Sequence, residues 1–163
     1  MTPIGTVREL IPTYRSIDAG DIGQLPSKPA QITSSRELAV LIRPIIGDAI
    51  DECVWCVYVD GANQLIAVYK ISEGGSTESL VPTAKIFRGA VLCNAAAFVI
   101  IHNHLSGRAY PSAADRAVTE KLVQAGDLMG IPCLDHVVLG KTEHWSFTDH
   151  GLIEEYRKLH EAK

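Results

Sequence analysis

Long hydrophobic runs are missing from this sequence of 163 residues. The longest uninterrupted apolar run extends from Ala95 to Ile101, far short of the roughly 20 residues that cross a bilayer as a helix. The first residues have neither the basic start nor the apolar centre of a secretory signal. Cysteines are few, and the four are too scattered to indicate a disulfide framework. We therefore expect a cytoplasmic protein from a reducing compartment, without a membrane partner.

An excess of basic residues is also absent. The sequence has 15 Lys and Arg residues against 19 Asp and Glu residues, which gives a formal net charge of −4. Proteins that bind nucleic acid nonspecifically usually present a basic face, so a nucleic-acid partner is possible but not favoured. Hydrophobic residues make up 47% of the chain, as in ordinary globular proteins. The length predicts one domain with a sizeable core, and the sequence does not indicate an oligomeric state.

Residues 1–33 differ in character from the rest of the chain, because prolines and glycines recur throughout them. We interpret this stretch as an irregular N-terminal arm that packs beside the domain, in preference to a partner-binding extension. From residue 34 to 163, segments with helical and strand periodicity alternate, starting at the capping box Ser34–Glu37 and ending in a helix over 152–162. This alternation predicts an α/β fold in which helices flank a mixed β-sheet.

Two histidines follow the most apolar segment of the chain. His102 and His104 come directly after Ala95–Ile101, a run that is typical of a buried strand. They therefore lie at the carboxyl end of that strand, where ligands collect in open α/β sheets. Because they are two residues apart in extended backbone, their side chains leave the same face and can reach one ion.

A second polar pair, Ser112 and Asp115, follows after a spacer of seven residues. Its spacing is that of a helix-capping box, which by itself explains both residues. The helix that follows favours a further role, because Asp115 shares an inward stripe with apolar residues: Val118, Leu122, Ala125 and Met129. A buried carboxylate needs a partner or a metal ion. His102, His104 and Asp115 then form the set of three ligands, with one open position, that is typical of catalytic zinc sites.

Two other patterns point away from competing chemistries. Cys53 and Cys56 have the spacing of a redox or zinc pair, but residues three apart in a strand-like run point to opposite faces. We interpret them as small buried hydrophobes. Zinc deaminases have His-x-Glu and a later Pro-Cys-x-x-Cys, whereas here the second site is a histidine and no such cysteine pair follows.

Glu52 opens the strand-like run 53–60 and is explained, on its own, as a solvated carboxylate at a strand end. Together with His-x-His, seven residues and Ser-x-x-Asp, it resembles the JAMM motif of the JAB/MPN metalloprotease-like fold. The chain resembles above all the bacterial RadC family over residues 34–153. Further motifs of that family stand here as Phe87-Arg88, His102–Gly107, Pro111–Asp115 and Leu134–Gly140.

This resemblance implies a fold and a site. The fold is the JAB/MPN (cytidine-deaminase-like) sandwich, here over residues 34–163. The resemblance implies a Zn²⁺ ion bound by His102, His104 and Asp115. It also implies that Glu52 is the general acid/base and that Ser112 stabilises the transition state.

The sequence departs from the family pattern in two places. Leu105 stands where the family usually has proline after the second histidine, which leaves the loop freer but removes no ligand. Residues 1–33 are too short for the helix-hairpin-helix module of full-length RadC proteins, so an inherited link to DNA is in doubt.

Three hypotheses for function follow. The leading one is a zinc-dependent hydrolase that cleaves a peptide or isopeptide bond in a protein substrate by zinc-activated water. The alternative is a metal-dependent nuclease or DNA-repair accessory, with Lys85, Arg88 and Arg108 near the motif to contact phosphates. The third is a binding module that has lost catalysis, which the complete ligand set disfavours.

Two features remain open at this stage. The loop Leu105–Pro111 is expected to form a rim of the substrate cleft, with Arg108 and Tyr110 contacting substrate, although plain connection explains it equally well. His136 either supports the zinc ligands or is a hydrogen-bonded core residue. The remaining histidines are expected at the surface: His144, His150 and His160.

Overall fold

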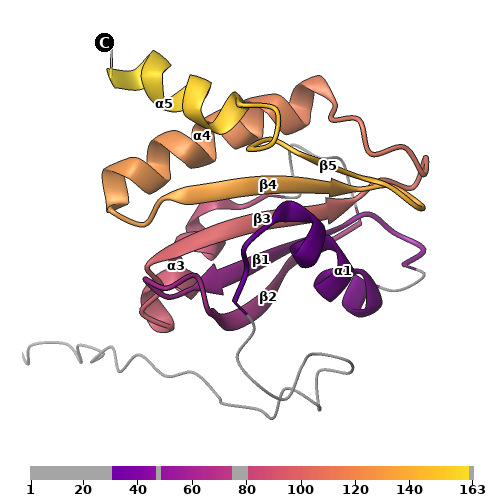
Figure 1. Cartoon of the computed structure of the whole chain (residues 1–163), viewed down its shortest axis with the longest axis horizontal. Coiled ribbons are helices and arrows are strands. Elements are labelled where there is room, and N and C mark those ends of the chain that lie inside the picture. The colour runs from indigo at the N-terminus through magenta and orange to yellow at the C-terminus, as the bar shows by residue number, and fades with distance from the viewer. Residues whose placement is uncertain (1–30, 47–48, 75–80, 162–163) are drawn as a thin grey trace, which may run out of the picture.

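The computed structural model describes residues 31–46, 49–74 and 81–161, and it shows helices on both sides of one β-sheet (Figure 1). Within these ranges the sheet has five strands, in the order β2-β1-β3-β4-β5. The strands are β1 (Cys53–Val59), β2 (Leu65–Glu73), β3 (Ala97–Asn103), β4 (Cys133–Leu139) and β5 (His144–Ser146). The helices are α1 (Ser35–Ile46), α3 (Thr83–Leu92), α4 (Ala113–Met129) and α5 (Leu152–Glu161).

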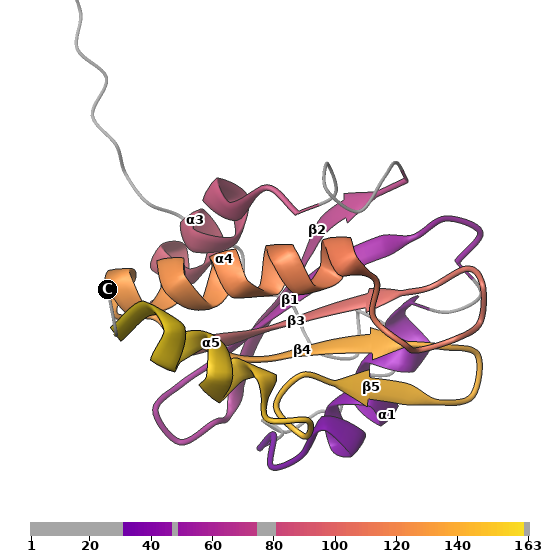
Figure 2. The same ribbon diagram turned by 90° about the horizontal axis from the view of Figure 1, so that it is seen from above.

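Each face of the sheet has its own hydrophobic core. α3, α4 and α5 cover one face, and α1 lies on the other (Figure 2). The first core includes Val54, Cys56, Phe87, Phe98, Ile100, Leu122, Val123 and Ile153. The second includes Leu38, Ile42, Val57, Val99, Ile101 and Val137. The predicted α/β fold, a mixed sheet flanked by helices, is confirmed.

β3 runs through the middle of the sheet, antiparallel to β1 and parallel to β4. It is buried along its length, with only Asn103 partly exposed. A strand covered on both faces can be apolar at every position, which explains the run of hydrophobic residues before His102. α4 connects the two parallel strands, so the carboxyl ends of β3 and β4 meet at one edge of the sheet, next to the start of α4.

The inward stripe of α4 ends earlier than the sequence indicated. Asp115 and Leu122 are buried as expected, but Met129 is 51% exposed, so the prediction for Met129 is wrong. The stripe closes instead at Gly126, where an added Cβ would lie 2.8 Å from the carbonyl oxygen of Ile131. The turn that leads into β4 fills the space beside the last turns of the helix, and Met129 falls outside it.

α1 continues past Pro44 to Ile46, so this proline does not end the helix. Arg43 holds its last turn through hydrogen bonds to three carbonyl oxygens of the β4–β5 turn, those of Gly140, Lys141 and Glu143, at 2.7, 3.0 and 2.9 Å. The predicted arm lies outside the described residues except for 31–33, where Gln31 forms an isolated bridge with Gln64. Among the helices described, none combines the length and the apolar composition of a membrane span.

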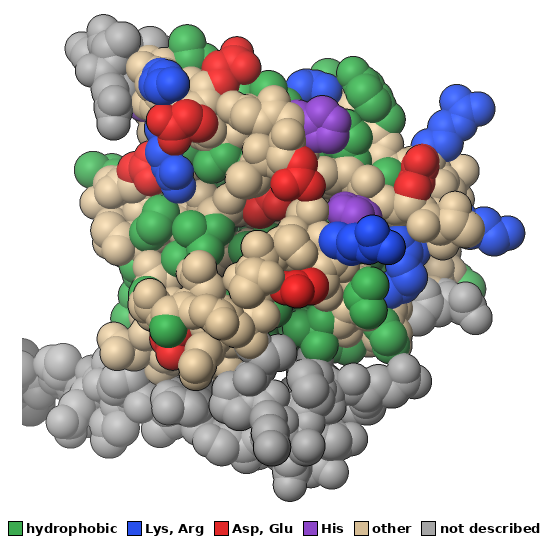
Figure 3. All heavy atoms as spheres, in the orientation of Figure 1, with side chains coloured by type: hydrophobic (Ala, Val, Ile, Leu, Met, Phe, Trp, Pro, Cys, Tyr) green, Lys and Arg blue, Asp and Glu red, His purple; other side chains and the backbone are tan. Residues whose placement is uncertain are grey.

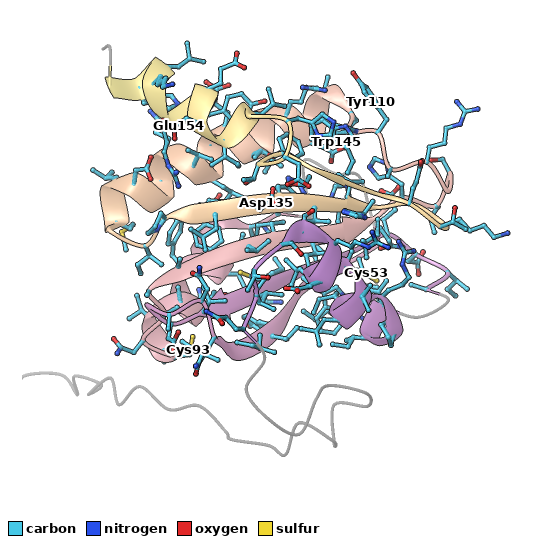
Figure 4. The ribbon with its side chains drawn as sticks, viewed as in Figure 1. Cys53, Cys93, Tyr110, Asp135, Trp145 and Glu154 are labelled. Atoms are coloured by element: carbon cyan, nitrogen blue, oxygen red, sulfur yellow. The ribbon has the colours of Figure 1, made fainter. Side chains whose placement is uncertain are left out.

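The cysteines behave as the sequence indicated. Cys53 and Cys56 are buried, and all four cysteines of the chain are free. Cys53 and Cys93 lie well apart (Figure 4). Burial raises the pKa of the Cys53 and Cys56 thiols, which keeps them protonated and unreactive.

Candidate metal centre

Three side chains from β3 and α4 converge at the carboxyl edge of the sheet. His102 and His104 stand at the end of β3, and Asp115 stands in the first turn of α4. The Nε2 atom of His102 lies 3.2 Å from Oδ1 of Asp115, and Nε2 of His104 lies 3.2 Å from Oδ2. The candidate ligand atoms all lie within 4.8 Å of one another, so this group can hold a metal ion.

The capping box at the start of α4 directs Asp115 into this group. Ser112 Oγ accepts a hydrogen bond from the backbone N–H of Asp115 at 3.1 Å. In return, Oδ2 of Asp115 accepts hydrogen bonds from both the backbone N–H and the hydroxyl of Ser112, each at 2.7 Å. The cap therefore occupies Oδ2 and leaves Oδ1 facing His102.

His102 Nε2 and Asp115 Oδ1 are buried polar atoms without a hydrogen-bond partner. Leaving such an atom unsatisfied costs about 1–3 kcal/mol, so native proteins rarely do it. Ligand atoms about 2.1 Å from a tetrahedral metal ion lie about 3.4 Å apart. The 3.2 Å separation of these two atoms is close to that spacing. The residues therefore fit a shared metal ion, which would satisfy both atoms.

A backbone carbonyl orients the ring of His104. Its Nδ1 lies 3.0 Å from the carbonyl oxygen of Arg108, so Nδ1 carries a hydrogen and donates it. In the neutral ring, Nε2 then presents its lone pair to the side of Asp115. The hydrogen bond to Asp115 stabilises the protonated ring and raises the pKa of His104.

The neighbours of Asp115 keep it ionised. Burial alone would raise the pKa of this carboxyl, but the adjacent side chains of His102, His104 and Ser112 hold the pKa well below its usual range. The carboxylate is the form that binds metal ions, so Asp115 is ready to serve as a ligand at neutral pH.

A second buried histidine stands behind His102. His136, in β4, is 1% exposed, and its Nε2 lies 2.8 Å from Nδ1 of His102. Its Nδ1 lies 2.6 Å from Oγ1 of Thr119 in α4. Burial, reinforced by the neighbouring His102, lowers the pKa of His136 well below its ordinary value. His136 is thus a core residue that also contacts a candidate ligand.

Glu52 precedes β1, the strand beside the histidines. Val54 pairs with His102 in the antiparallel register of β1 and β3, and continuing that register places Glu52 opposite His104 on the same face. The carbonyl oxygen of Glu52 accepts a hydrogen bond from Gly74 N at 2.9 Å. Its charge contributes to the raised pKa of His104. The fold therefore brings this distant carboxylate to the His–Asp group.

An aromatic and cationic surface flanks the loop between His104 and Ser112. Tyr110 is 69% exposed, and its ring lies beside that of Trp145, with centroids 6.3 Å apart (Figure 4). The guanidinium of Arg116 lies 5.6 Å from the centroid of each ring. We call Tyr110, Trp145 and Arg116 the aromatic rim.

His104 also borders a cavity of about 220 Å³. Other residues that line this cavity include Leu105, Arg43 and Lys141. Lys and Arg side chains gather on the right of the molecule in Figure 3, around a surface histidine. The overall acidic charge thus coexists with a local basic region.

Other residues that the sequence singled out lie in a variety of surroundings. Lys85 donates to the carbonyl oxygens of Lys70 and Ile71, so β2 engages its ammonium group. Arg88 lines a cavity together with Tyr58. Tyr58 pairs with Phe98 near the start of β3, whereas the histidines lie at the other end of that strand. His150 is exposed as expected, whereas two predicted surface histidines are half-buried: His144 and His160.

Comparison with known proteins places these features in a family. A family model described as the RadC-like JAB domain matches residues 32–152. A UPF0758 protein of Salinibacter ruber is 37% identical over 124 residues, which is 76% of this chain and 53% of that protein. A UPF0758 protein of Flavobacterium johnsoniae is 32% identical over 126 residues, or 77% of this chain and 55% of that protein. One from Methanosarcina mazei is 33% identical over 124 residues, or 76% and 54%.

This chain spans about half the length of the curated relatives it matches. The match covers the whole sheet and the His–Asp group. The chain therefore belongs to the RadC-like JAB domain family.

Proposed function

We propose that this domain is a zinc-dependent hydrolase that cleaves a peptide or isopeptide bond in a protein substrate. The observation that supports this most is the buried pair His102 Nε2 and Asp115 Oδ1, which face each other at 3.2 Å without hydrogen-bond partners. Two imidazole nitrogens and a carboxylate oxygen suit zinc, and three protein ligands leave a fourth position for water or substrate. Membership of the JAB domain family is consistent with this chemistry.

Zinc, when bound, lowers the pKa of a coordinated water to about 7 and so supplies a nucleophile at neutral pH. We assign Glu52 as the general base, because it precedes the strand whose Val54 pairs with His102 and because its charge acts on His104. Its carboxylate accepts the proton of the attacking water as the new C–O bond forms. It then returns that proton to the amine nitrogen as the C–N bond breaks.

We assign Ser112 to the oxygen that becomes negatively charged in the transition state. The Ser112 hydroxyl donates to Oδ2 of Asp115, so it must turn away from that oxygen to reach substrate. The backbone N–H of Ser112 donates to the same oxygen, so the carboxylate keeps a donor when the hydroxyl turns. Donors of this kind contribute about 10²–10³ in kcat.

Metal content and three variants test the proposal. Purified protein should contain about one zinc per chain, and His102→Ala and Asp115→Ala should each lose it. Glu52→Gln should retain zinc, because Glu52 is not among the ligands, and should lose turnover by about 10²-fold or more. Equal zinc in the parent and in both ligand variants would show that the site is assigned wrongly.

A panel of substrates distinguishes the three functional hypotheses. Zinc-loaded protein is incubated with peptides and isopeptide-linked proteins and, in parallel, with single-stranded and double-stranded DNA. Cleavage of the protein substrates that depends on Glu52 supports the proposal. Cleavage of DNA that depends on Glu52 identifies a nuclease. Bound zinc without turnover of any substrate identifies a binding module.

A further inference from the structure

We propose that Thr119 and His136 are positioning residues that hold His102 in the tautomer with hydrogen on Nδ1, so that the Nε2 lone pair faces the metal position. The inference rests on the metal site proposed above and extends it to two residues outside the ligand set. Thr119, His136 and His102 are 0%, 1% and 2% exposed, so water does not compete for their hydrogen bonds. They form one continuous chain from α4 through β4 to β3.

The chain starts with a hydroxyl whose hydrogen is already used. Oγ1 of Thr119 lies 2.5 Å from the carbonyl oxygen of Asp115, four residues earlier in α4. A carbonyl oxygen can only accept, so the hydroxyl donates to it. Toward any other neighbour, Oγ1 of Thr119 acts as an acceptor.

The next link is His136. Its Nδ1 lies 2.6 Å from Oγ1 of Thr119, so Nδ1 must carry a hydrogen and donate it. The ring is stacked on Phe147, with centroids 5.0 Å apart, and this apolar enclosure disfavours the charged imidazolium. A neutral imidazole has one ring hydrogen, so Nε2 of His136 is left as an acceptor.

The last link sets the tautomer of His102. Its Nδ1 lies 2.8 Å from Nε2 of His136, so Nδ1 of His102 carries the hydrogen. Nε2 of His102 is then a lone pair that faces Oδ1 of Asp115. Two acceptors face each other there, which explains why neither atom has a hydrogen bond although they are only 3.2 Å apart. A metal ion bound between them would accept a lone pair from each atom.

Removing the Thr119 hydroxyl would reverse the direction of the hydrogen bond between His136 and His102. The Nδ1–H of His136 would then lack an acceptor, whereas a hydrogen on Nε2 of His136 would find Nδ1 of His102. His102 would carry its own hydrogen on Nε2 and donate it to Oδ1 of Asp115. That hydrogen occupies the lone pair with which His102 binds metal, so zinc binding must first undo the more stable tautomer.

Thr119→Val and Thr119→Ser form the matched pair that tests this inference. Valine keeps the shape of threonine and removes the hydroxyl, whereas serine keeps the hydroxyl. Histidine tautomers are measured in metal-free, ¹⁵N-histidine-labelled protein from multiple-bond ¹H–¹⁵N correlations of the imidazole rings. Zinc affinity is measured by competition with a chromogenic chelator, and thermal unfolding checks that each variant is folded.

We expect the parent and Thr119→Ser to show His102 with hydrogen on Nδ1 and to bind zinc with similar affinity. Thr119→Val should show hydrogen on Nε2 of His102 and bind zinc about ten- to a hundred-fold more weakly. His136→Gln supplies a second comparison, because its amide oxygen can replace Nε2 as acceptor. It should bind zinc more tightly than His136→Leu, which offers no acceptor.

The possible failures are distinguishable. If Thr119→Val keeps the hydrogen on Nδ1 of His102 and binds zinc as tightly as the parent, the role of Thr119 and His136 is overturned while the zinc site stands. If the parent binds no zinc, the proposed function fails, and the tautomers of the metal-free protein still decide the hydrogen-bond chain.

Discussion

Gly140 packs against the backbone of Gly107 so closely that a Cβ at position 140 would lie 2.6 Å from the Gly107 carbonyl oxygen. The same carbonyl accepts a hydrogen bond from Lys141 N at 2.9 Å, which ties the loop after His104 to the end of β4. Both partners are backbone, so side-chain rotation cannot relieve a clash. The path of this loop therefore depends on glycine at position 140.

Gly140→Ala is expected to destabilise the protein by about 1–3 kcal/mol through overpacking. It should also weaken zinc binding, because the displaced loop carries the Arg108 carbonyl that orients His104. Gly61→Ala is the control, since an added Cβ there meets nothing within 4 Å. Urea unfolding and chelator competition measure the two effects. An unchanged zinc affinity in Gly140→Ala would show that the loop does not position His104.

Zinc should raise the thermal stability of the protein. At a free zinc concentration a hundredfold above Kd, binding to the folded state alone contributes about 2.7 kcal/mol. For a chain of this size, that corresponds to an increase in Tm of roughly 5–10 °C. Scanning calorimetry with and without zinc measures it. Asp115→Ala should show no increase, and a similar increase in that variant would mean that zinc stabilises the protein elsewhere.

Two serines that cap helices separate capping from function. Ser112 Oγ accepts from Asp115 N at the start of α4, and Ser34 Oγ accepts from Glu37 N at the start of α1. Alanine at either position should cost about 1 kcal/mol of stability. Only Ser112→Ala should also lower kcat, because only Ser112 adjoins the metal centre. Equal kcat in the two variants would reduce Ser112 to a capping residue.

The loop that carries Arg108 and Tyr110 should contribute to substrate binding and not to zinc binding. Replacing Arg108 and Tyr110 with alanine should raise KM for a verified substrate and leave zinc content unchanged, since neither side chain contacts a candidate ligand. Tyr69→Ala is the control, because Tyr69 is a partly exposed aromatic residue on β2. If KM is the same in the parent and the double variant, the loop only connects β3 to α4.

Asp135 should make stability depend on pH. It accepts hydrogen bonds from Ser146 Oγ and from the backbone N–H groups of His136 and Thr148. Burial nevertheless raises the pKa of Asp135, and these hydrogen bonds offset only part of that increase. An acid whose pKa is higher in the folded state binds more protons there. Its stabilising contribution is therefore complete below the unfolded pKa of about 4 and is lost as pH rises through the folded pKa.

Asp135→Asn removes this titration. The free energy of unfolding of the variant, relative to the parent, should therefore increase as pH rises from about 4 to 7. Urea unfolding of metal-free protein across this range measures the difference. A constant difference, or one that shifts toward the parent, would contradict the raised pKa.

The sequence was informative about the candidate ligands because they are close together in the chain. His102 and His104 follow one buried strand, and the spacing of Ser112 and Asp115 marks the start of the next helix. Strand alternation and helix periodicity are local properties, so they predict which of these side chains share a face. The α/β fold with a mixed sheet was predicted from the same local patterns.

The partners of His102 were beyond such reasoning. His136 reaches it because β4 lies parallel to β3 with Ile100 paired to His136, a register that no local pattern specifies. Thr119 falls one turn after Asp115 on the inward face of α4, and this spacing is a signal that sequence reasoning could have used. Its contact with His136 still depends on how the helix packs on the sheet. Met129 was misplaced for the same reason.

All three candidate ligands come from residues 102–115, the end of one strand and the start of the following helix. An ion held by them closes a small ring of backbone, and closing a short segment costs less chain entropy than joining distant ones. Such an ion would link the end of β3 to the start of α4. The β1–β2 hairpin, which follows Glu52, lies outside that ring. A displacement of the hairpin would therefore move Glu52, the proposed general base, without releasing the ion.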